Sequence, residues 1–156
     1  MTETIHEIFS AHRFLSGLPE GTVEVLAECA RAETFEAGRL LLREGDVADT
    51  FHLIHRGRVS IKIHGPGRGR HILDTVGPGL TVGLSWAAPP FRCQFDARAL
   101  EPVVAVAVDS ECLRARLGEN PAIGYALLER LASVLIGRLQ VARVRLLDLY
   151  GNDSDR

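Results

Sequence analysis

The chain has 156 residues, a length that suits one compact domain with a helical appendage. Hydrophobic residues make up 46% of it and charged residues 24%, as in ordinary globular proteins. The net charge of −2 excludes the broad basic field that drives non-specific nucleic-acid binding. We therefore expect no direct contact with nucleic acid.

The sequence shows no targeting or membrane-spanning segment. The N-terminus has no apolar core of the kind found in signal peptides, and no run of roughly 18 apolar residues occurs. We expect a cytoplasmic protein without membrane association. The three cysteines, Cys29, Cys93 and Cys112, are far apart and odd in number, so we expect neither a disulfide framework nor a zinc site.

The first thirty residues are expected to be mostly helical. Residues 1–13 form a weakly helical lead before the domain proper, which we place at residues 14–150. Pro19 can occupy the first turn of a clearer helix, which should end near Ala30 or Arg31.

Short β-strands separated by glycine-containing turns follow. They recur about every 8–12 residues, a spacing typical of a β-barrel or sandwich, here over about residues 32–108. The expected strands are 34–38, 39–43, 51–55, 59–63, 71–76, 95–97 and 103–108. A glycine-rich loop at 65–69 lacks the GK[ST] signature and a following helix, so we expect a hairpin tip rather than a phosphate-binding loop.

Two helices are expected over about residues 110–150, followed by a polar, frayed tail at 151–156. Asp109 or Ser110 can cap the first helix, which Gly118 ends. The second runs from Pro121 to about Tyr150, roughly 45 Å at 1.5 Å per residue.

The long helix carries two apolar bands. One of them approaches a heptad repeat and consists of Leu128, Leu131, Leu135, Leu139, Ala142 and Leu146. The other contains Leu127, Val134, Val141 and Val144. We expect one band to pack on the barrel and the other on the same helix of a second copy, giving a homodimer. The alternative is one wide buried face within a monomer.

Arginines are also frequent on this helix. They are Arg130, Arg138, Arg143 and Arg145, and acidic residues at 129 and 148 interrupt them. Such mixed charge favours a solvated face over a nucleic-acid surface.

The stretch from Val76 to Ala99 is the most irregular part of the β-region. It opens on the turn Gly77-Pro78-Gly79, passes Gly83 and continues into a short apolar segment. Pro89-Pro90 breaks that segment, and one cation, Arg92, follows.

These features together resemble the cyclic-nucleotide-binding domain family, the sensor half of catabolite-activator-type regulators. The resemblance covers about residues 14–150. It is carried by Phe14-Leu15-Ser16-Gly17-Leu18, Phe35-x-x-Gly38, Glu44-Gly45-Asp46, Phe51-His52-Leu53-Ile54-x-x-Gly57-x-Val59, Gly77-Pro78-Gly79 and Gly83. It implies a mainly β fold with flanking helices: a jelly-roll barrel that binds its ligand under a short cassette helix, and a long helix that pairs subunits.

The resemblance implies a ligand site made by six cassette residues. They are Gly83, Leu84, Ser85, Trp86, Arg92 and Cys93. A cyclic phosphate needs an arginine and backbone N–H groups, and the ribose needs an acceptor, in the family a Glu after the cassette glycine. That position is Leu84 here, and one missing contact lowers affinity by about 1–3 kcal/mol. Four readings stay open: a weaker nucleotide site using Arg92, a different anion, an apolar ligand, or no ligand.

The expected function is that of a non-enzymatic sensor. It would bind a small anion such as cAMP or cGMP and signal through the long helix to a protein partner. The alternatives are a ligand-free interaction protein, or the sensor part of a transcription regulator. The chain ends six residues after Tyr150, so no DNA-recognition helix is expected within it.

Enzymatic readings are weaker. A metal-binding cupin needs histidines that converge, whereas His52 and His55 are three apart and fall on opposite faces of a strand. Ser85 lacks the G-x-S-x-G context of a nucleophile. Cys93 has two interpretations. In the first, the neighbouring Arg92 lowers the pKa of its thiol and the cysteine senses oxidants; in the second, it is a small hydrophobic residue that lines the pocket.

Overall fold

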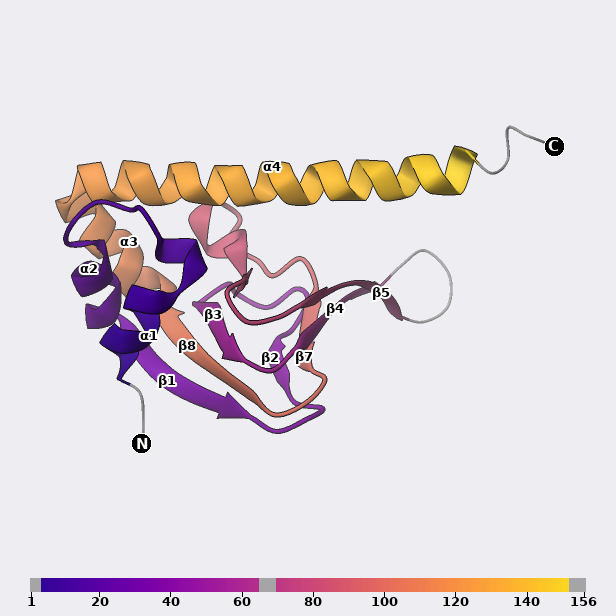
Figure 1. Cartoon of the computed structure of the whole chain (residues 1–156), viewed down its shortest axis with the longest axis horizontal. Coiled ribbons are helices and arrows are strands. Elements are labelled where there is room, and N and C mark those ends of the chain that lie inside the picture. The colour runs from indigo at the N-terminus through magenta and orange to yellow at the C-terminus, as the bar shows by residue number, and fades with distance from the viewer. Residues whose placement is uncertain (1–3, 65–69, 152–156) are drawn as a thin grey trace.

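The computed structural model describes residues 4–64 and 70–151 (Figure 1). Its helical elements are α1 (Ile5–Ala11), η1 (Arg13–Leu15), α2 (Thr22–Glu28), η2 (Leu84–Ala87), α3 (Ser110–Glu119) and α4 (Pro121–Gly151). Its strands are β1 (Ala30–Phe35), β2 (Leu40–Leu42), β3 (Thr50–Arg56), β4 (Val59–His64), β5 (Arg70–Val76), β6 (Thr81–Val82), β7 (Asp96–Ala99) and β8 (Val103–Asp109). The predicted hairpin tip at 65–69 and most of the predicted tail lie outside the described residues.

The strands form two antiparallel four-stranded sheets, ordered β1-β8-β3-β6 and β2-β7-β4-β5. Apolar residues of both sheets, such as Leu53 of β3 and Ile61 of β4, belong to one hydrophobic core. Among the strands of residues 4–64 and 70–151, no pairing joins the two sheets. The predicted mainly β fold with flanking helices is confirmed, and the sheets are not closed into a barrel.

The boundary between α2 and β1 differs from the prediction. The helix ends at Glu28 instead of Ala30 or Arg31, because residues from Ala30 onward pair with β8. Six consecutive register pairs, from Ala30–Val108 to Phe35–Val103, outweigh the helical spacing of the apolar residues Val23, Leu26, Ala27 and Ala30, which favoured a longer helix. The two-residue strand β6 was not predicted, since two residues are too few to show an alternating pattern.

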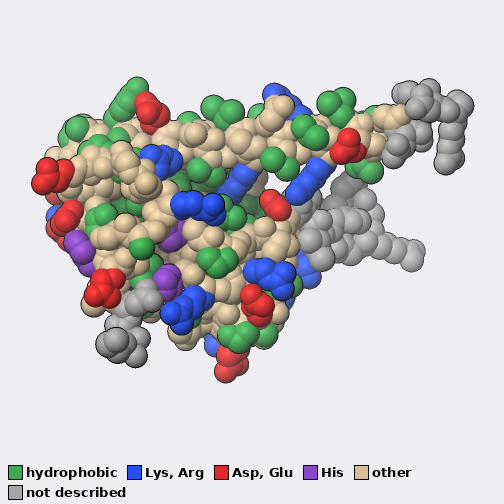
Figure 2. All heavy atoms as spheres, in the orientation of Figure 1, with side chains coloured by type: hydrophobic (Ala, Val, Ile, Leu, Met, Phe, Trp, Pro, Cys, Tyr) green, Lys and Arg blue, Asp and Glu red, His purple; other side chains and the backbone are tan. Residues whose placement is uncertain are grey.

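The long helix α4 packs on the rest of the protein through its N-terminal half. Gly124, Leu127 and Leu131 are buried, and Leu131 is only 3% exposed. Most of the apolar side chains beyond residue 134 face solvent: Leu135 and Leu139 are each 50% exposed. Figure 2 shows hydrophobic side chains along the outer edge of this helix. No helix within the described part of the chain has the length and apolar character needed to cross a bilayer.

Two buried histidines make stability depend on pH. His52 in β3 is 2% exposed, and burial lowers its pKa from 6.5 to about 4. The pKa of His12, whose Nε2 lies 3.1 Å from the carbonyl oxygen of Ile54, is lowered by burial as well.

We expect the free energy of unfolding to fall by about 3 kcal/mol between pH 6.5 and pH 4 from His52 alone. In that window the unfolded chain binds a proton at this imidazole and the folded chain does not, so stability is present above pH 6.5 and lost on acidification. Urea titrations across this range measure the slope, and NMR titration of His52 assigns it. An imidazole that titrates near pH 6.5 in the folded protein would contradict the prediction.

Candidate functional site

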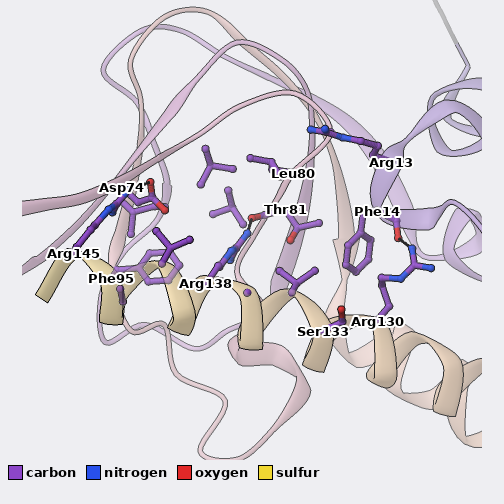
Figure 3. A pocket seen from close by; sticks show the side chains of 18 of the residues that line it. Arg13, Phe14, Asp74, Leu80, Thr81, Phe95, Arg130, Ser133, Arg138 and Arg145 are labelled. Atoms are coloured by element: carbon purple, nitrogen blue, oxygen red, sulfur yellow. Dashed lines mark hydrogen bonds and ion pairs between the residues drawn. The ribbon is translucent and has the colours of Figure 1, made fainter. Parts of the chain in front are cut away.

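A cavity of about 1020 Å³ lies between α4 and the β-sheets (Figure 3). Residues from η1, β4, β5, β6 and the segment before β7 form one wall, and α4 forms the other. The described lining residues are Arg13, Phe14, Ile61, Asp74, Val76, Gly79, Leu80, Thr81, Val82, Phe95, Arg130, Ser133, Val134, Gly137, Arg138, Val141, Ala142, Arg145, Leu146 and Leu149. The walls are thus largely apolar, with a few charged groups.

The predicted cassette begins at Gly83, directly after the cavity-lining strand β6. Gly83 has φ +95°, and a Cβ there would lie 2.9 Å from Cδ1 of Leu42 and 3.1 Å from the carbonyl oxygen of Thr50. Only glycine fits both the backbone conformation and the space. Gly83 therefore directs the chain from β6 into the short helix η2.

The short helix η2 is anchored to the core by Trp86. This side chain is 1% exposed, and its ring centroid lies 5.6 Å from that of Phe51. From outside, Arg114 of α3 donates a 2.9 Å hydrogen bond to the carbonyl oxygen of Trp86. The Arg114 guanidinium also lies over the ring of Phe91, 4.4 Å from its centroid. The cassette is thus attached to the helix that leads into α4.

Arg92 and Cys93 point in opposite directions. The segment is extended, with a bridge between Val47 and Arg92 and a hydrogen bond from the Cys93 amide to the carbonyl oxygen of Asp46. Consecutive side chains therefore alternate: Arg92 is exposed and Cys93 is buried. Burial raises the pKa of the Cys93 thiol, and the nearby carboxylates of Asp46 and Asp49 raise it further. The oxidant-sensing interpretation requires a lowered thiol pKa, and that prediction is wrong.

Arg138 of α4 is a cation in the cavity wall. It is partly buried, and one guanidinium nitrogen donates a 2.8 Å hydrogen bond to the carbonyl oxygen of Thr81. Burial lowers the pKa of Arg138, and the carboxylate of Asp74 opposes that shift. Asp74 itself lies 3.7 Å from a guanidinium nitrogen of Arg145.

Arg130 lines the cavity near Phe14 and Ser133 (Figure 3). Its two terminal nitrogens donate 2.7 Å hydrogen bonds to the carbonyl oxygens of Phe14 and Ser16. The prediction of a solvated arginine face on α4 is therefore wrong for Arg130 and Arg138, which turn onto the protein. Arg143 is exposed as predicted.

None of the six predicted cassette residues belongs to the described lining of this cavity. Gly83, Leu84, Ser85 and Trp86 are contiguous and follow the lining residue Val82. Arg138, Thr81 and Phe95 line the cavity but were not predicted. The signal for Arg138 was its spacing: Arg130, Arg138 and Arg145 are eight and seven residues apart, which places them on one face of a helix.

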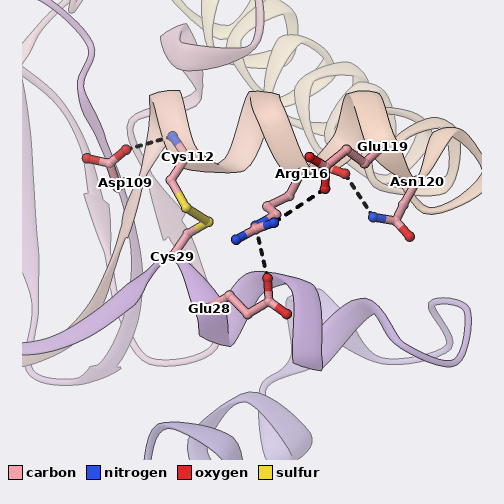
Figure 4. Close-up of a disulfide and its surroundings, with 7 residues drawn as sticks. All are labelled: Glu28, Cys29, Asp109, Cys112, Arg116, Glu119 and Asn120. Atoms are coloured by element: carbon pink, nitrogen blue, oxygen red, sulfur yellow. Dashed lines mark hydrogen bonds and ion pairs between the residues drawn. A yellow bond between two sulfur atoms is a disulfide. The ribbon is translucent and has the colours of Figure 1, made fainter.

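A disulfide joins Cys29, after α2, to Cys112 in the first turn of α3 (Figure 4). This corrects the expectation that the cysteines stay unpaired: the two lie 83 residues apart in sequence, yet their Cα atoms are 5.7 Å apart. Asp109 caps α3 by accepting a 2.7 Å hydrogen bond from the Cys112 amide. Glu28 pairs with Arg116 at 2.9 Å, so α2 and α3 are joined at two points.

Comparison with known proteins agrees with this architecture. A family profile for the cyclic nucleotide-binding domain matches residues 32–120, more than half of the chain. A CRP-like cAMP-activated global transcriptional regulator of Mycobacterium tuberculosis strain H37Rv is 26% identical over 147 residues. The match covers 94% of this chain but only 64% of the regulator, so the chain spans less than two thirds of that relative.

Solved structures share the fold. A cyclic nucleotide-binding domain from Methylobacillus flagellatus superposes with a TM-score of 0.78 at 24% identity, covering 92% of this chain and 81% of that one. A cyclic nucleotide-binding protein from Geobacter metallireducens gives 0.76 at 24% identity, covering 88% and 99%. On the profile match and this shared architecture, the chain belongs to the cyclic nucleotide-binding domain family.

Proposed function

We propose that the protein is a ligand-sensing regulatory module. It binds a small anionic ligand, such as cAMP or cGMP, in the cavity under α4 and transmits binding through α4 to a protein partner. The observation that carries this proposal is that one helix contributes both cations and apolar side chains to the cavity wall. A ligand there contacts α4 directly.

The family and the regulator point to a regulatory role rather than a catalytic one. The regulator is described as cAMP-activated, which makes cAMP the first ligand to test here. Its transcriptional role also supports the proposal that this chain works in the cytoplasm.

A thermal-shift screen with cAMP, cGMP and cyclic dinucleotides tests ligand binding. A ligand that binds only the folded protein stabilises it by about 2.7 kcal/mol at a concentration of one hundred times Kd, which raises Tm by several degrees. We expect such a shift with at least one cyclic mononucleotide. An unchanged Tm at millimolar concentrations of all of them would favour the alternative, a ligand-free interaction protein.

We also propose that α4 pairs with α4 of a second copy. Its exposed apolar positions Leu128, Leu135, Leu139 and Leu146 lie near one line along the helix, with the exposed Ala132 between the first two. Such a repeat of threes and fours is the pattern of paired helices. Leu131, which the sequence placed in this band, lies in the core of its own chain.

Replacing Leu135 and Leu139 together by glutamate should convert a dimer to a monomer, because two charges per helix would then face each other across an apolar seam. Both side chains are half exposed in a single chain, so the fold should persist. Light scattering at micromolar concentration measures the mass. Gln140→Glu, an exposed position about 100° around α4 from Leu139, is the control and should leave the dimer intact. A wild-type monomer would contradict the proposal.

A further inference from the structure

The cavity under α4 holds two polar groups whose bonding capacity is largely unused. Thr81 is 1% exposed, and its Oγ1 has no hydrogen-bond partner among the described residues. Arg138 lies beside it from α4 and bonds the Thr81 carbonyl, not the hydroxyl (Figure 3). A guanidinium has five N–H donors, and Arg138, a lining residue of the cavity, uses one of them in this hydrogen bond.

The charges around the cavity favour an anion. Four arginines, Arg13, Arg130, Arg138 and Arg145, and one carboxylate, Asp74, are among the described lining residues. Arg13 is exposed, Arg130 is held by two backbone carbonyls and Arg145 lies 3.7 Å from Asp74, so the partly buried Arg138 is the cation best placed to meet a ligand. A partly buried cation without a carboxylate in hydrogen-bond contact gains most from an incoming negative charge.

The predicted cassette contributes no cation to the described lining of the cavity. The only arginine between Gly83 and Phe95 is Arg92, whose side chain is exposed and absent from the described lining. Leu84 occupies the position of the expected ribose acceptor. The opposite wall offers the apolar side chains of Ile61, Val82 and Phe95.

We propose that the anionic group of the ligand is bound by Arg138 and the Thr81 hydroxyl beneath α4, rather than by Arg92. The ligand class is a small organic monoanion whose apolar or aromatic part packs on Ile61, Val82 and Phe95. This inference rests on the proposed sensing function and deepens it. Because Arg138 belongs to α4, the ligand's charge acts directly on the helix that exposes the proposed dimer seam.

The test measures Kd by calorimetry for two charged probes and their uncharged counterparts. The pairs are cAMP with adenosine, and decanoate with decanol, and they separate a nucleotide from a simple amphiphilic carboxylate. Binding of either charged probe should exceed that of its uncharged counterpart by about tenfold or more, since a charge-assisted hydrogen bond contributes roughly 1.5–3 kcal/mol. Equal affinity within both pairs overturns the inference.

Three variants identify the residues that bind the anionic group of the ligand. Arg138→Gln should weaken the charged probe by about tenfold or more and leave the uncharged one unchanged. Thr81→Val keeps the shape and the carbonyl that Arg138 bonds, and should weaken the charged probe by about threefold to tenfold without lowering Tm, because it removes an unpartnered buried hydroxyl. Arg92→Gln should have no effect.

The remaining outcomes separate this inference from the proposed function. Loss of binding in Arg92→Gln with none in Arg138→Gln would overturn the anchoring by α4 and leave a cyclic-nucleotide sensor standing. Failure of every probe to bind the wild type, together with no shift in the cyclic-nucleotide screen, would remove the sensing function and the inference with it.

Discussion

Replacing Cys29 and Cys112 by alanine should lower the free energy of unfolding by about 4 kcal/mol. The disulfide closes a loop of 83 residues, and the entropy that such a loop removes from the unfolded chain grows with its length. It joins the end of α2 to the start of α3, the helix that precedes α4. Most of the β-sandwich lies inside this loop.

Urea unfolding with and without dithiothreitol measures the effect. The wild type in reductant should match the double alanine variant, and the variant should not respond to reductant. Cys93→Ala is the control, because this cysteine is buried and unpaired and its replacement should leave the reductant effect intact. A wild-type unfolding curve that is insensitive to reductant would contradict the prediction. Disulfides are rare in the cytoplasm, where thiols are kept reduced. The unfolding free energy measured in dithiothreitol therefore gives the stability of the protein in such a compartment.

Gly57→Ala should destabilise the protein by more than about 3 kcal/mol. Gly57 has φ +87°, which disfavours any side chain by about 1–2 kcal/mol. A Cβ there would also collide with the carbonyl oxygen of Pro102 and lie 3.0 Å from Cα of Val103. Both are backbone atoms, one in the first residue of the central strand β8 and the other in the residue before it, so relief requires moving the start of that strand.

Gly38→Ala separates the cost of the backbone conformation from the cost of the steric collision. Gly38 has φ +90°, and a Cβ there would meet nothing within 4 Å. The Gly38→Ala variant should therefore lose only the part that comes from backbone conformation, about 1–2 kcal/mol. Equal losses of unfolding free energy in the two variants, measured by urea unfolding, would show that Pro102 and Val103 do not restrict a side chain at position 57.

The fold could be predicted from local patterns because glycines mark its turns. Gly17, Gly38, Gly45, Gly57 and Gly83 all have positive φ, which glycine adopts without steric penalty. Each belongs to a motif that supported the resemblance to the family. The spacing of turns thus carried most of the information about where the strands lie along the chain.

The site was harder to predict because it depends on which side chains face inward. Arg92 and Cys93 differ by one residue, and in an extended segment one residue exchanges the inner and outer faces. Spacing from Gly83 could not decide between them. The burial of Arg138 depends on how α4 docks on the sheets, and the pairing of Cys29 with Cys112 depends on contacts between α2 and α3. Neither is a property of a local pattern.

A ¹⁵N–¹H NMR titration with cAMP tests whether this family member binds its ligand in the cavity under α4. We expect chemical-shift changes gathered at Thr81 and Val82 and, on α4, at Gly137 and Arg138, with little change around Val47 and Arg92. Changes confined to Val47 and Arg92, or no change at millimolar cAMP, cGMP and decanoate, would contradict it.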